Sequence, residues 1–170
     1  MGSKLFRRLI LPFGARSSLR RAKNPKKAGV LDSSETGDPG LMKRVLIIDD
    51  QPTDVRLAAE VLDQLGINNV EVRTNAAEAR MYLDAVCDSK QPCPDVILLD
   101  LDLGYESGYE LMRFWHRNPK LAGCRVVVWT VLGKEHEEMC RLFGIEDVVP
   151  KWEGMAALKR VLASLAAHAS

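Results

Sequence analysis

This 170-residue sequence has no long hydrophobic run, few histidines and no paired cysteine motif. Its apolar stretches fall well short of the roughly 18 residues that a membrane-spanning helix needs. The cysteines form no CxxC pair, and with only three histidines they have no zinc-finger spacing. Glycine-rich phosphate loops and the motifs of Ser-His-Asp hydrolases are also missing. These absences exclude a helical membrane-spanning protein, a zinc finger and the commonest nucleotide-binding and hydrolytic enzymes.

The four cysteines are Cys87, Cys93, Cys124 and Cys140. We expect all of them to be reduced thiols, as in a cytoplasmic protein, because their spacing indicates neither a disulfide framework nor a metal site. A redox pair of Cys87 and Cys93 is the alternative, since five residues between them would allow a closed loop.

Charge divides the chain into two parts. Residues 1–41 hold nine Lys or Arg and three Asp or Glu, whereas residues 42–170 hold fifteen and twenty. Three interpretations of the basic part stay open: a disordered extension, an over-extended gene start ahead of Met42, or an arm for anionic membrane or nucleic acid. The acidic remainder has the size of one domain, and we expect no nucleic-acid binding from it.

From residue 43 onward, short apolar runs alternate with helical patterns. The runs predict strands at 45–48, 70–72, 96–99, 126–129 and 147–149. Helices are predicted at 54–65, from 75, at 107–118, around 139–143 and at 155–165; Asn75/Glu78 and Ser107/Glu110 have capping-box spacing. Strands and helices in alternation predict an α/β fold, with a parallel sheet covered by helices on both faces.

Polar side chains follow four of the predicted strands. Because the carboxyl ends of parallel strands share one edge of the sheet, we expect these residues to meet there: Asp49, Asp50, Asp100, Asp102, Thr130 and Lys151. Crowded carboxylates recruit a cation, and hard oxygen ligands suit Mg²⁺. Carboxylate, Mg²⁺, hydroxyl and ammonium together predict a site for a phosphoryl group, with one aspartate as the nucleophile.

Four segments in this order resemble the receiver domain of two-component response regulators: 49–50, 96–100, 127–130 and 149–151. The resemblance covers residues 43–168 and implies a flavodoxin-like, doubly wound sheet of five parallel strands in the order 2-1-3-4-5. It implies a cytoplasmic single-domain signalling protein at residues 42–170, which takes part in phosphorelay signal transduction and turns over no separate substrate.

The resemblance also assigns roles by position. Asp100 becomes the phosphoacceptor and Asp50 the principal Mg²⁺ ligand, with Asp49 beside it and the backbone carbonyl of Asp102 completing the metal site. Thr130 and Lys151 then bind the phosphoryl oxygens. The implied donor is a phosphohistidine on a sensor histidine kinase or a histidine phosphotransfer protein.

Three residues depart from the family pattern. Val131 replaces a small residue and narrows access to Asp100, whereas Val148 replaces an aromatic switch residue. Trp152 follows Lys151 where the family usually has proline. These departures keep open a pseudo-receiver, a binding module of the same fold that is not phosphorylated.

Leu98-Leu99-Asp100-Leu101-Asp102 also imitates the nucleophile motif of haloacid-dehalogenase-type phosphatases, although its place on the third strand counts against that enzyme. For a receiver, the resemblance implies either docking on a target protein or service as a phosphorelay shuttle. The face of the fourth helix, fifth strand and fifth helix, at residues 134–143 and 152–167, is where the target would dock, and a homodimer is kept as a further alternative. The three histidines are interpreted as exposed helical residues without partners.

Overall fold

The computed structural model describes residues 44–104, 106–133 and 135–168. The predictions for residues 1–41 therefore lie outside the described residues. The described helices are too short or too polar to cross a lipid bilayer.

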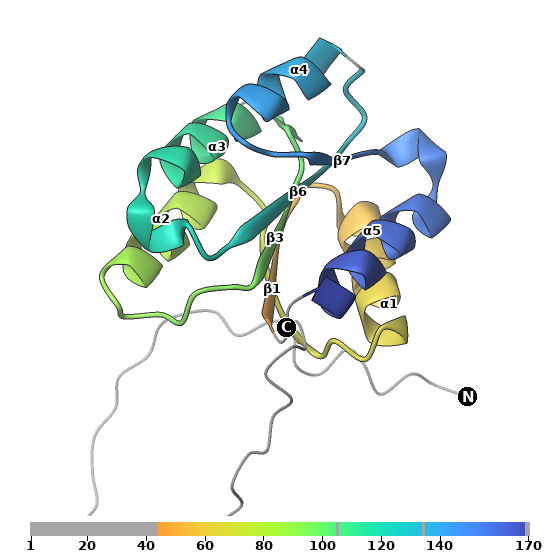
Figure 1. Ribbon diagram of the computed structural model, residues 1–170, viewed down its shortest axis with the longest axis horizontal. Coiled ribbons are helices and arrows are strands. Elements are labelled where there is room, and N and C mark those ends of the chain that lie inside the picture. Colours follow the sequence, from red (N-terminus) through yellow and green to blue (C-terminus); the bar gives the residue numbers. More distant parts are fainter. Residues whose placement is uncertain (1–43, 105, 134, 169–170) are drawn as a thin grey trace, which may run out of the picture. The chain divides into compact units, whose positions relative to one another are not determined.

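Five parallel strands form the central sheet, in the spatial order β2-β1-β3-β6-β7 (Figure 1). Counted along the chain, this is the predicted order 2-1-3-4-5, which is thereby confirmed. A two-stranded antiparallel hairpin after β3 was not predicted. The strands are β1 (Arg44–Ile48), β2 (Asn69–Arg73), β3 (Val96–Leu99), β6 (Arg125–Thr130) and β7 (Asp147–Pro150), and the hairpin consists of β4 (Asp102–Leu103) and β5 (Glu106–Ser107).

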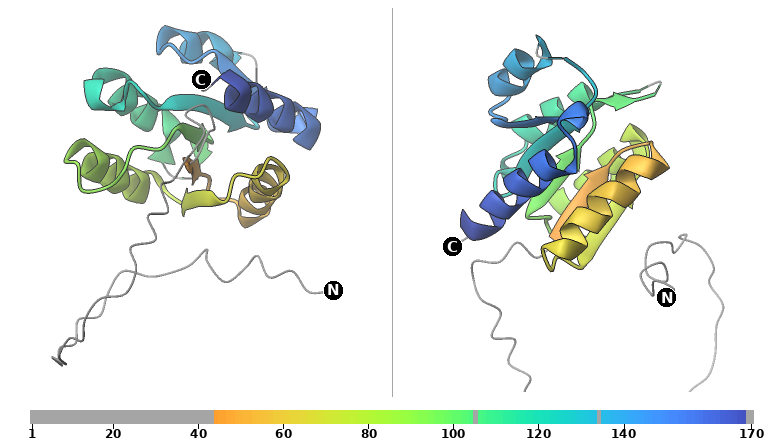
Figure 2. Two further views of the ribbon diagram at one scale, coloured as in Figure 1. Left: turned by 60° about the horizontal axis from the view of Figure 1, so that its bottom comes forward. Right: turned by 90° about the vertical axis from the view of Figure 1, so that its right-hand side faces the viewer.

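Five α-helices cover the two faces of this sheet. α1 and α5 lie beside each other on one face, and α2, α3 and α4 lie on the other (Figures 1 and 2). The helices are α1 (Pro52–Gln64), α2 (Ala76–Cys87), α3 (Gly108–Arg117), α4 (Glu135–Leu142) and α5 (Met155–His168). The predicted doubly wound architecture is confirmed.

Helix ends follow local chemistry. α1 begins at Pro52, two residues before the predicted start, because a proline in the first turn needs no hydrogen-bond acceptor for its nitrogen. Asn75 caps α2 as predicted, since its Oδ1 accepts the Glu78 N–H at 2.8 Å. Ser107 caps α3, but its Oγ accepts the N–H of Tyr109 rather than that of Glu110.

The core lies in two layers because strand side chains alternate between the faces. Leu46 and Ile48 of β1 pack toward α2 and α3, whereas Val45 and Ile47 pack toward α1 and α5. Burial of each such side chain contributes roughly 1.5–3 kcal/mol relative to exposure. Strands buried on both faces therefore need apolar side chains at every position. Their packing holds the strand backbones, and with them the residues at the strand ends, in fixed positions.

Two histidines have partners, which corrects the expectation that they have none. His116 is exposed, as predicted, whereas His136 is half-buried. The Tyr109 hydroxyl of α3 forms a hydrogen bond with Nδ1 of His136 on α4. Nδ1 of His116 lies 3.2 Å from the carbonyl oxygen of Phe143, and the two rings meet edge to face. The sequence pattern missed these contacts because each joins α3 to a residue 27 positions away along the chain.

All four cysteines are free thiols; Cys93 is exposed and the other three are buried. The predicted reduced state agrees with this arrangement. Burial raises the pKa of the Cys124 thiol above its usual range, so this group stays protonated.

Candidate functional site

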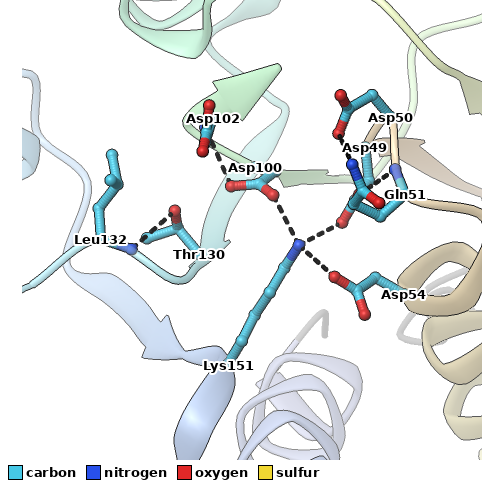
Figure 3. A network of polar contacts seen from close by, with 9 residues as sticks. All are labelled: Asp49, Asp50, Gln51, Asp54, Asp100, Asp102, Thr130, Leu132 and Lys151. Atoms are coloured by element: carbon cyan, nitrogen blue, oxygen red, sulfur yellow. Dashed lines mark hydrogen bonds and ion pairs between the residues drawn. The ribbon is translucent and has the colours of Figure 1, made fainter. Parts of the chain in front are cut away.

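The polar residues at the strand ends meet at one edge of the sheet, as predicted (Figure 3). Asp49 follows β1, Asp100 follows β3, Thr130 ends β6 and Lys151 follows β7. The two aspartates and the threonine are each at most 3% exposed. A buried set of this kind requires partners for every charged group.

Backbone hydrogen bonds extend the strand pairing into the site. The Asp100 N–H donates to the Ile48 carbonyl at 2.9 Å, and the Asp49 N–H donates to the Arg73 carbonyl at 3.1 Å. These two bonds fix the backbones that carry both carboxylates, so the carboxylates lie on neighbouring strand ends.

The Lys151 ammonium lies among three carboxylates. Its Nζ is 2.8 Å from Asp49 Oδ2, 2.6 Å from Asp54 Oδ2 and 2.6 Å from Asp100 Oδ2. The Lys151 side chain is only 8% exposed. We call these four residues the Lys151 cluster. Three carboxylates share one ammonium, so the cluster carries an excess of negative charge.

The other oxygens of the two buried carboxylates accept backbone hydrogen bonds. Asp49 Oδ1 accepts the Gln51 N–H at 2.9 Å, and Asp100 Oδ1 accepts the Asp102 N–H at 3.1 Å. Both carboxylates are therefore oriented from two sides before any ligand arrives. The Asp102 side chain itself is exposed, so the structure gives this residue a backbone contact with Asp100.

Burial and pairing shift two pKa values. Burial raises the pKa of Asp49 to about 6, although its hydrogen bonds to Lys151 and Gln51 oppose that shift. Burial alone would lower the pKa of Lys151, but the bonds to Asp100, Asp49 and Asp54 raise it above its ordinary value. Lys151 therefore stays charged, while the Asp49 carboxyl ionises less readily than an ordinary aspartate.

Asp54 was missed by the sequence analysis, which placed it only at the start of a helix. It lies in the first turn of α1, where an acidic side chain is common because it favours the helix N-terminus. No sequence signal separates that ordinary role from an ion pair with a lysine 97 positions away.

An aromatic ring also contacts the ammonium. Nζ of Lys151 lies 5.1 Å from the centroid of the Trp129 ring, within range of a cation–π interaction. Trp129 is buried, and its Nε1 has no hydrogen-bond partner among the described residues. Trp129 therefore packs against the charged centre of the site as well as within the core.

The predicted metal ligands provide a suitable set of donors. Asp49, Asp50 and Asp100 offer hard carboxylate oxygens without sulfur or imidazole, as Mg²⁺ prefers. Within the described residues, no three acidic, histidine or cysteine side chains already converge as a metal site. Lys151 bonds two of the carboxylates, and Asp50 Oδ1 accepts a hydrogen bond from Gln51 Nε2 at 3.1 Å.

Two glycines allow the backbone to approach these aspartates. A Cβ on Gly108 would lie 2.5 Å from the Asp100 carbonyl oxygen, which is closer than packing permits. A Cβ on Gly104 would lie 3.3 Å from Asp50 Oδ2, and Gly104 also has a positive φ of 69°. The start of α3 and the β4–β5 hairpin therefore pack closely around the two acids.

The part of the site around Thr130 has fewer hydrogen bonds than the Lys151 cluster. The Thr130 Oγ1 accepts the Leu132 N–H at 3.3 Å, and no hydrogen bond found among the described residues joins it to Asp100 (Figure 3). Val131 is 53% exposed, whereas Val148 is half-buried against the α2–α4 face of the core. Trp152 is 59% exposed, in a short 3-10 turn that begins with Lys151.

Response regulators are among the known proteins with similar sequences and structures. The chain is 30% identical over 112 residues to the phosphate regulon transcriptional regulatory protein PhoB of Escherichia coli, covering 65% of this chain and 46% of PhoB. It is 31% identical over 123 residues to response regulator Rcp1 of Synechocystis, covering 71% of this chain and 75% of Rcp1. The chain thus spans less than half the length of some curated relatives that it matches.

A solved structure shows the same architecture. The Mn(2+)-bound form of response regulator Rcp1 aligns with a TM-score of 0.62 at 25% identity, covering 72% of this chain and 91% of that chain. Residues 45–163 match the response regulator receiver domain as a family. The chain therefore belongs to the response regulator receiver domain family.

Proposed function

We propose that Asp100 accepts a phosphoryl group from a phosphohistidine, on a sensor histidine kinase or a histidine phosphotransfer protein, in a Mg²⁺-dependent reaction. The phosphorylated protein then signals by docking with another protein in the cytoplasm. The receiver domain in this proposal comprises residues 42–170, and it turns over no separate substrate. Family membership removes the haloacid-dehalogenase-type phosphatase as an alternative.

One observation carries the proposal: Asp100 is a buried carboxylate held by the Lys151 ammonium and by the Asp102 N–H. A carboxylate with no other task would be costly at this position, because burial disfavours its charge. A nucleophile needs this combination of fixed orientation and a nearby positive charge.

The phosphoryl transfer uses groups already in place. An oxygen of Asp100 attacks the phosphorus, the new O–P bond forms as the N–P bond to the donor histidine breaks, and the imidazole leaves with the electron pair. Lys151 neutralises charge on the phosphoryl oxygens. The Thr130 hydroxyl accepts its present bond from Leu132, so its own hydrogen is available to a phosphoryl oxygen.

Asp50, Asp49, Asp100 and the carbonyl of Asp102 would hold Mg²⁺, which when bound neutralises the phosphoryl oxygens. The Mn(2+)-bound form of Rcp1, a similar protein, supports a divalent cation in this family. Because the cation binds only the folded chain, we expect Mg²⁺ to raise the melting temperature. Asp50→Ala should abolish that shift, and an unchanged shift would contradict this metal site.

The face for signalling in this proposal combines α4, β7 and α5. Glu135 and Glu138 give it an exposed acidic edge, and Met139 and Leu142 expose apolar surface beside them. A basic partner protein suits this edge, and a second copy as a homodimer is the other occupant that we consider. Phosphorylation would act by shifting the balance between two conformations of this face.

Intact-protein mass spectrometry tests the proposal. The protein is incubated with acetyl phosphate, with and without Mg²⁺, beside the variants Asp100→Asn and Asp63→Asn. We expect a Mg²⁺-dependent gain of one phosphoryl group that Asp100→Asn loses. Asp63→Asn is the matched control, because it makes the same change at an exposed position outside the site, and it should retain the gain.

The second candidate is a pseudo-receiver, favoured by two departures from the family pattern: Val148 stands in place of an aromatic side chain, and Val131 in place of a small one. It predicts no phosphoryl gain, either from acetyl phosphate or from a phosphorylated histidine kinase. A gain in wild type that Asp100→Asn lacks would exclude it.

A further inference from the structure

Lys151 has three carboxylate partners, and they come from different elements of the fold. Asp49 and Asp100 are at strand ends, whereas Asp54 lies in the first turn of α1 (Figure 3). The Asp54 bond is as short as the Asp100 bond, at 2.6 Å for each. An ammonium has three N–H donors, so the three carboxylates use all of them.

The three carboxylates differ in what the proposed reaction would do to them. Asp100 becomes an acyl phosphate and ceases to be a free carboxylate. Asp49 belongs to the acids that would hold the cation, and its Oδ1 already accepts the Gln51 N–H. Asp54 takes part in neither change. Its side chain is 23% exposed, against 2% for the other two, so it is the one of the three that stays in contact with water.

We propose that Asp54 is a positioning residue for phosphoryl transfer, which holds the Lys151 ammonium beside Asp100 while the other two carboxylates change partners. This inference rests on the proposed phosphorylation of Asp100 and adds a residue to that site. Asp54 acts through Lys151 and touches neither the phosphoryl group nor the donor.

A purely structural role for Asp54 makes a different prediction. An acidic side chain in the first turn of a helix stabilises that helix through the helix dipole. That role would change the melting temperature without depending on Lys151. A double-mutant cycle separates the two roles, because only positioning requires both partners.

The experiment measures the initial rate of phosphoryl gain from acetyl phosphate with Mg²⁺, by intact-protein mass spectrometry. Asp54→Ala, Asp54→Asn and Asp54→Glu are compared with wild type, and Asp54→Ala is repeated in a Lys151→Ala background. Asp63→Ala is the matched control, because it removes the same charge from an exposed position near the other end of α1. Thermal unfolding confirms that each variant is folded at the assay temperature.

We expect Asp54→Ala to lower the rate about tenfold, since misplaced catalytic groups cost factors of this order or more. Asp54→Glu should recover most of the rate, Asp54→Asn should not, and Asp63→Ala should match wild type. In the Lys151→Ala background, Asp54→Ala should change the rate less than twofold.

Three results would overturn the inference. A wild-type rate in Asp54→Ala would show that Lys151 needs no such anchor. An equal loss in the Lys151→Ala background would assign the effect to the helix. A wild-type chain that gains no phosphoryl group from acetyl phosphate or a phosphorylated kinase would overturn this inference together with the proposed function, whereas the first two results leave that function intact.

Discussion

Asp100 has the Lys151 ammonium on one side and Thr130 on another, and the two sides differ in how many hydrogen bonds and ion pairs their side chains already make (Figure 3). In the Lys151 cluster, one ammonium bonds three carboxylates at 2.6–2.8 Å. On the other side, the Thr130 hydroxyl accepts one hydrogen bond from its own loop. Figure 3 shows the dashed contacts concentrated on the lysine side of Asp100.

This difference indicates that the two sides have different roles. The charged groups of the Lys151 cluster are held by strand and helix backbones, so their positions are fixed before any ligand binds. The Thr130 region has a hydroxyl with an available hydrogen, followed by the exposed Val131. After the proposed phosphorylation of Asp100, the backbone around Thr130 should therefore move more than the Lys151 cluster, because fewer hydrogen bonds must break there.

Removal of the Lys151 ammonium should have the largest effect on the free energy of unfolding. Lys151→Met leaves three carboxylates without their shared cation, and loss of one partner from a buried ion pair costs about 3–5 kcal/mol. Urea unfolding at pH 7.5 measures this loss. It should shrink at pH 5, where Asp49 is protonated. Lys159→Met, which removes a surface lysine bonded to Gln64, is the control. An equal effect of both variants would contradict the role assigned to the cluster.

The pH dependence of stability tests the Lys151 cluster next. Asp49 has a pKa of about 6 in the folded chain against an ordinary value of 3.8, so the folded chain binds this proton more tightly. The contribution of Asp49 to the free energy of unfolding is therefore fully present below about pH 4 and is lost as the pH rises to about 6, by on the order of 3 kcal/mol.

Asp49→Asn should remove that part of the pH dependence. Urea unfolding between pH 4 and 7.5, in buffer with EDTA, compares the variant with wild type. The difference in unfolding free energy between the two chains should change across this range and level off above about pH 6. A constant difference would show that burial does not raise the pKa of Asp49.

Close packing behind Asp100 gives a third, smaller effect. Gly108→Ala places a Cβ against the Asp100 carbonyl oxygen and should destabilise the fold by about 2 kcal/mol, because the backbone must shift. Gly123→Ala is the matched control, since nothing lies within 4 Å of the Cβ that it adds. Chemical denaturation compares the two variants, and similar midpoints would argue against the tight contact.

The smallest effect is expected on the Thr130 side. Thr130→Val removes one acceptor for the Leu132 N–H and should cost about 1 kcal/mol. The pH dependence that Asp49 causes should stay unchanged, because Thr130 makes no bond to the Lys151 cluster. Urea titrations at pH 5 and pH 7.5 measure both quantities. A change in the pH dependence would show that the two sides are coupled in the unphosphorylated chain.

Much of the fold could be predicted from two features of the sequence: the spacing of apolar residues and the polar residues that follow the strands. The apolar runs at residues 45–48 and 96–99 have no polar side chain, so only a sheet buried on both faces accommodates them. Parallel pairing then brings Asp49, Asp100 and Lys151 to one edge without any further information. The strand order and the gathering of these residues follow from the same rule.

Other parts of the site depend on tertiary contacts that no local pattern encodes. Asp54 resembles any acidic residue at the start of a helix, and only the tertiary fold, which brings the first turn of α1 to the end of β7, places it beside Lys151. The close approach at Gly108 depends on where α3 begins relative to Asp100. The Tyr109–His136 hydrogen bond joins two helices that are separate in sequence, so the positions of the histidines along the chain could not predict it.

The buried ring beside Lys151 has an optical consequence. Indole emission responds to nearby charge, and Trp129 lies 5.1 Å from the only ammonium of the cluster. Trp115 donates its Nε1–H to the carbonyls of Leu121 and Cys124, and Trp152 is exposed to solvent. With those two replaced by phenylalanine, Trp129 would serve as an intrinsic fluorescent probe. Its emission wavelength and intensity should follow the position of the Lys151 ammonium during the proposed phosphorylation of Asp100.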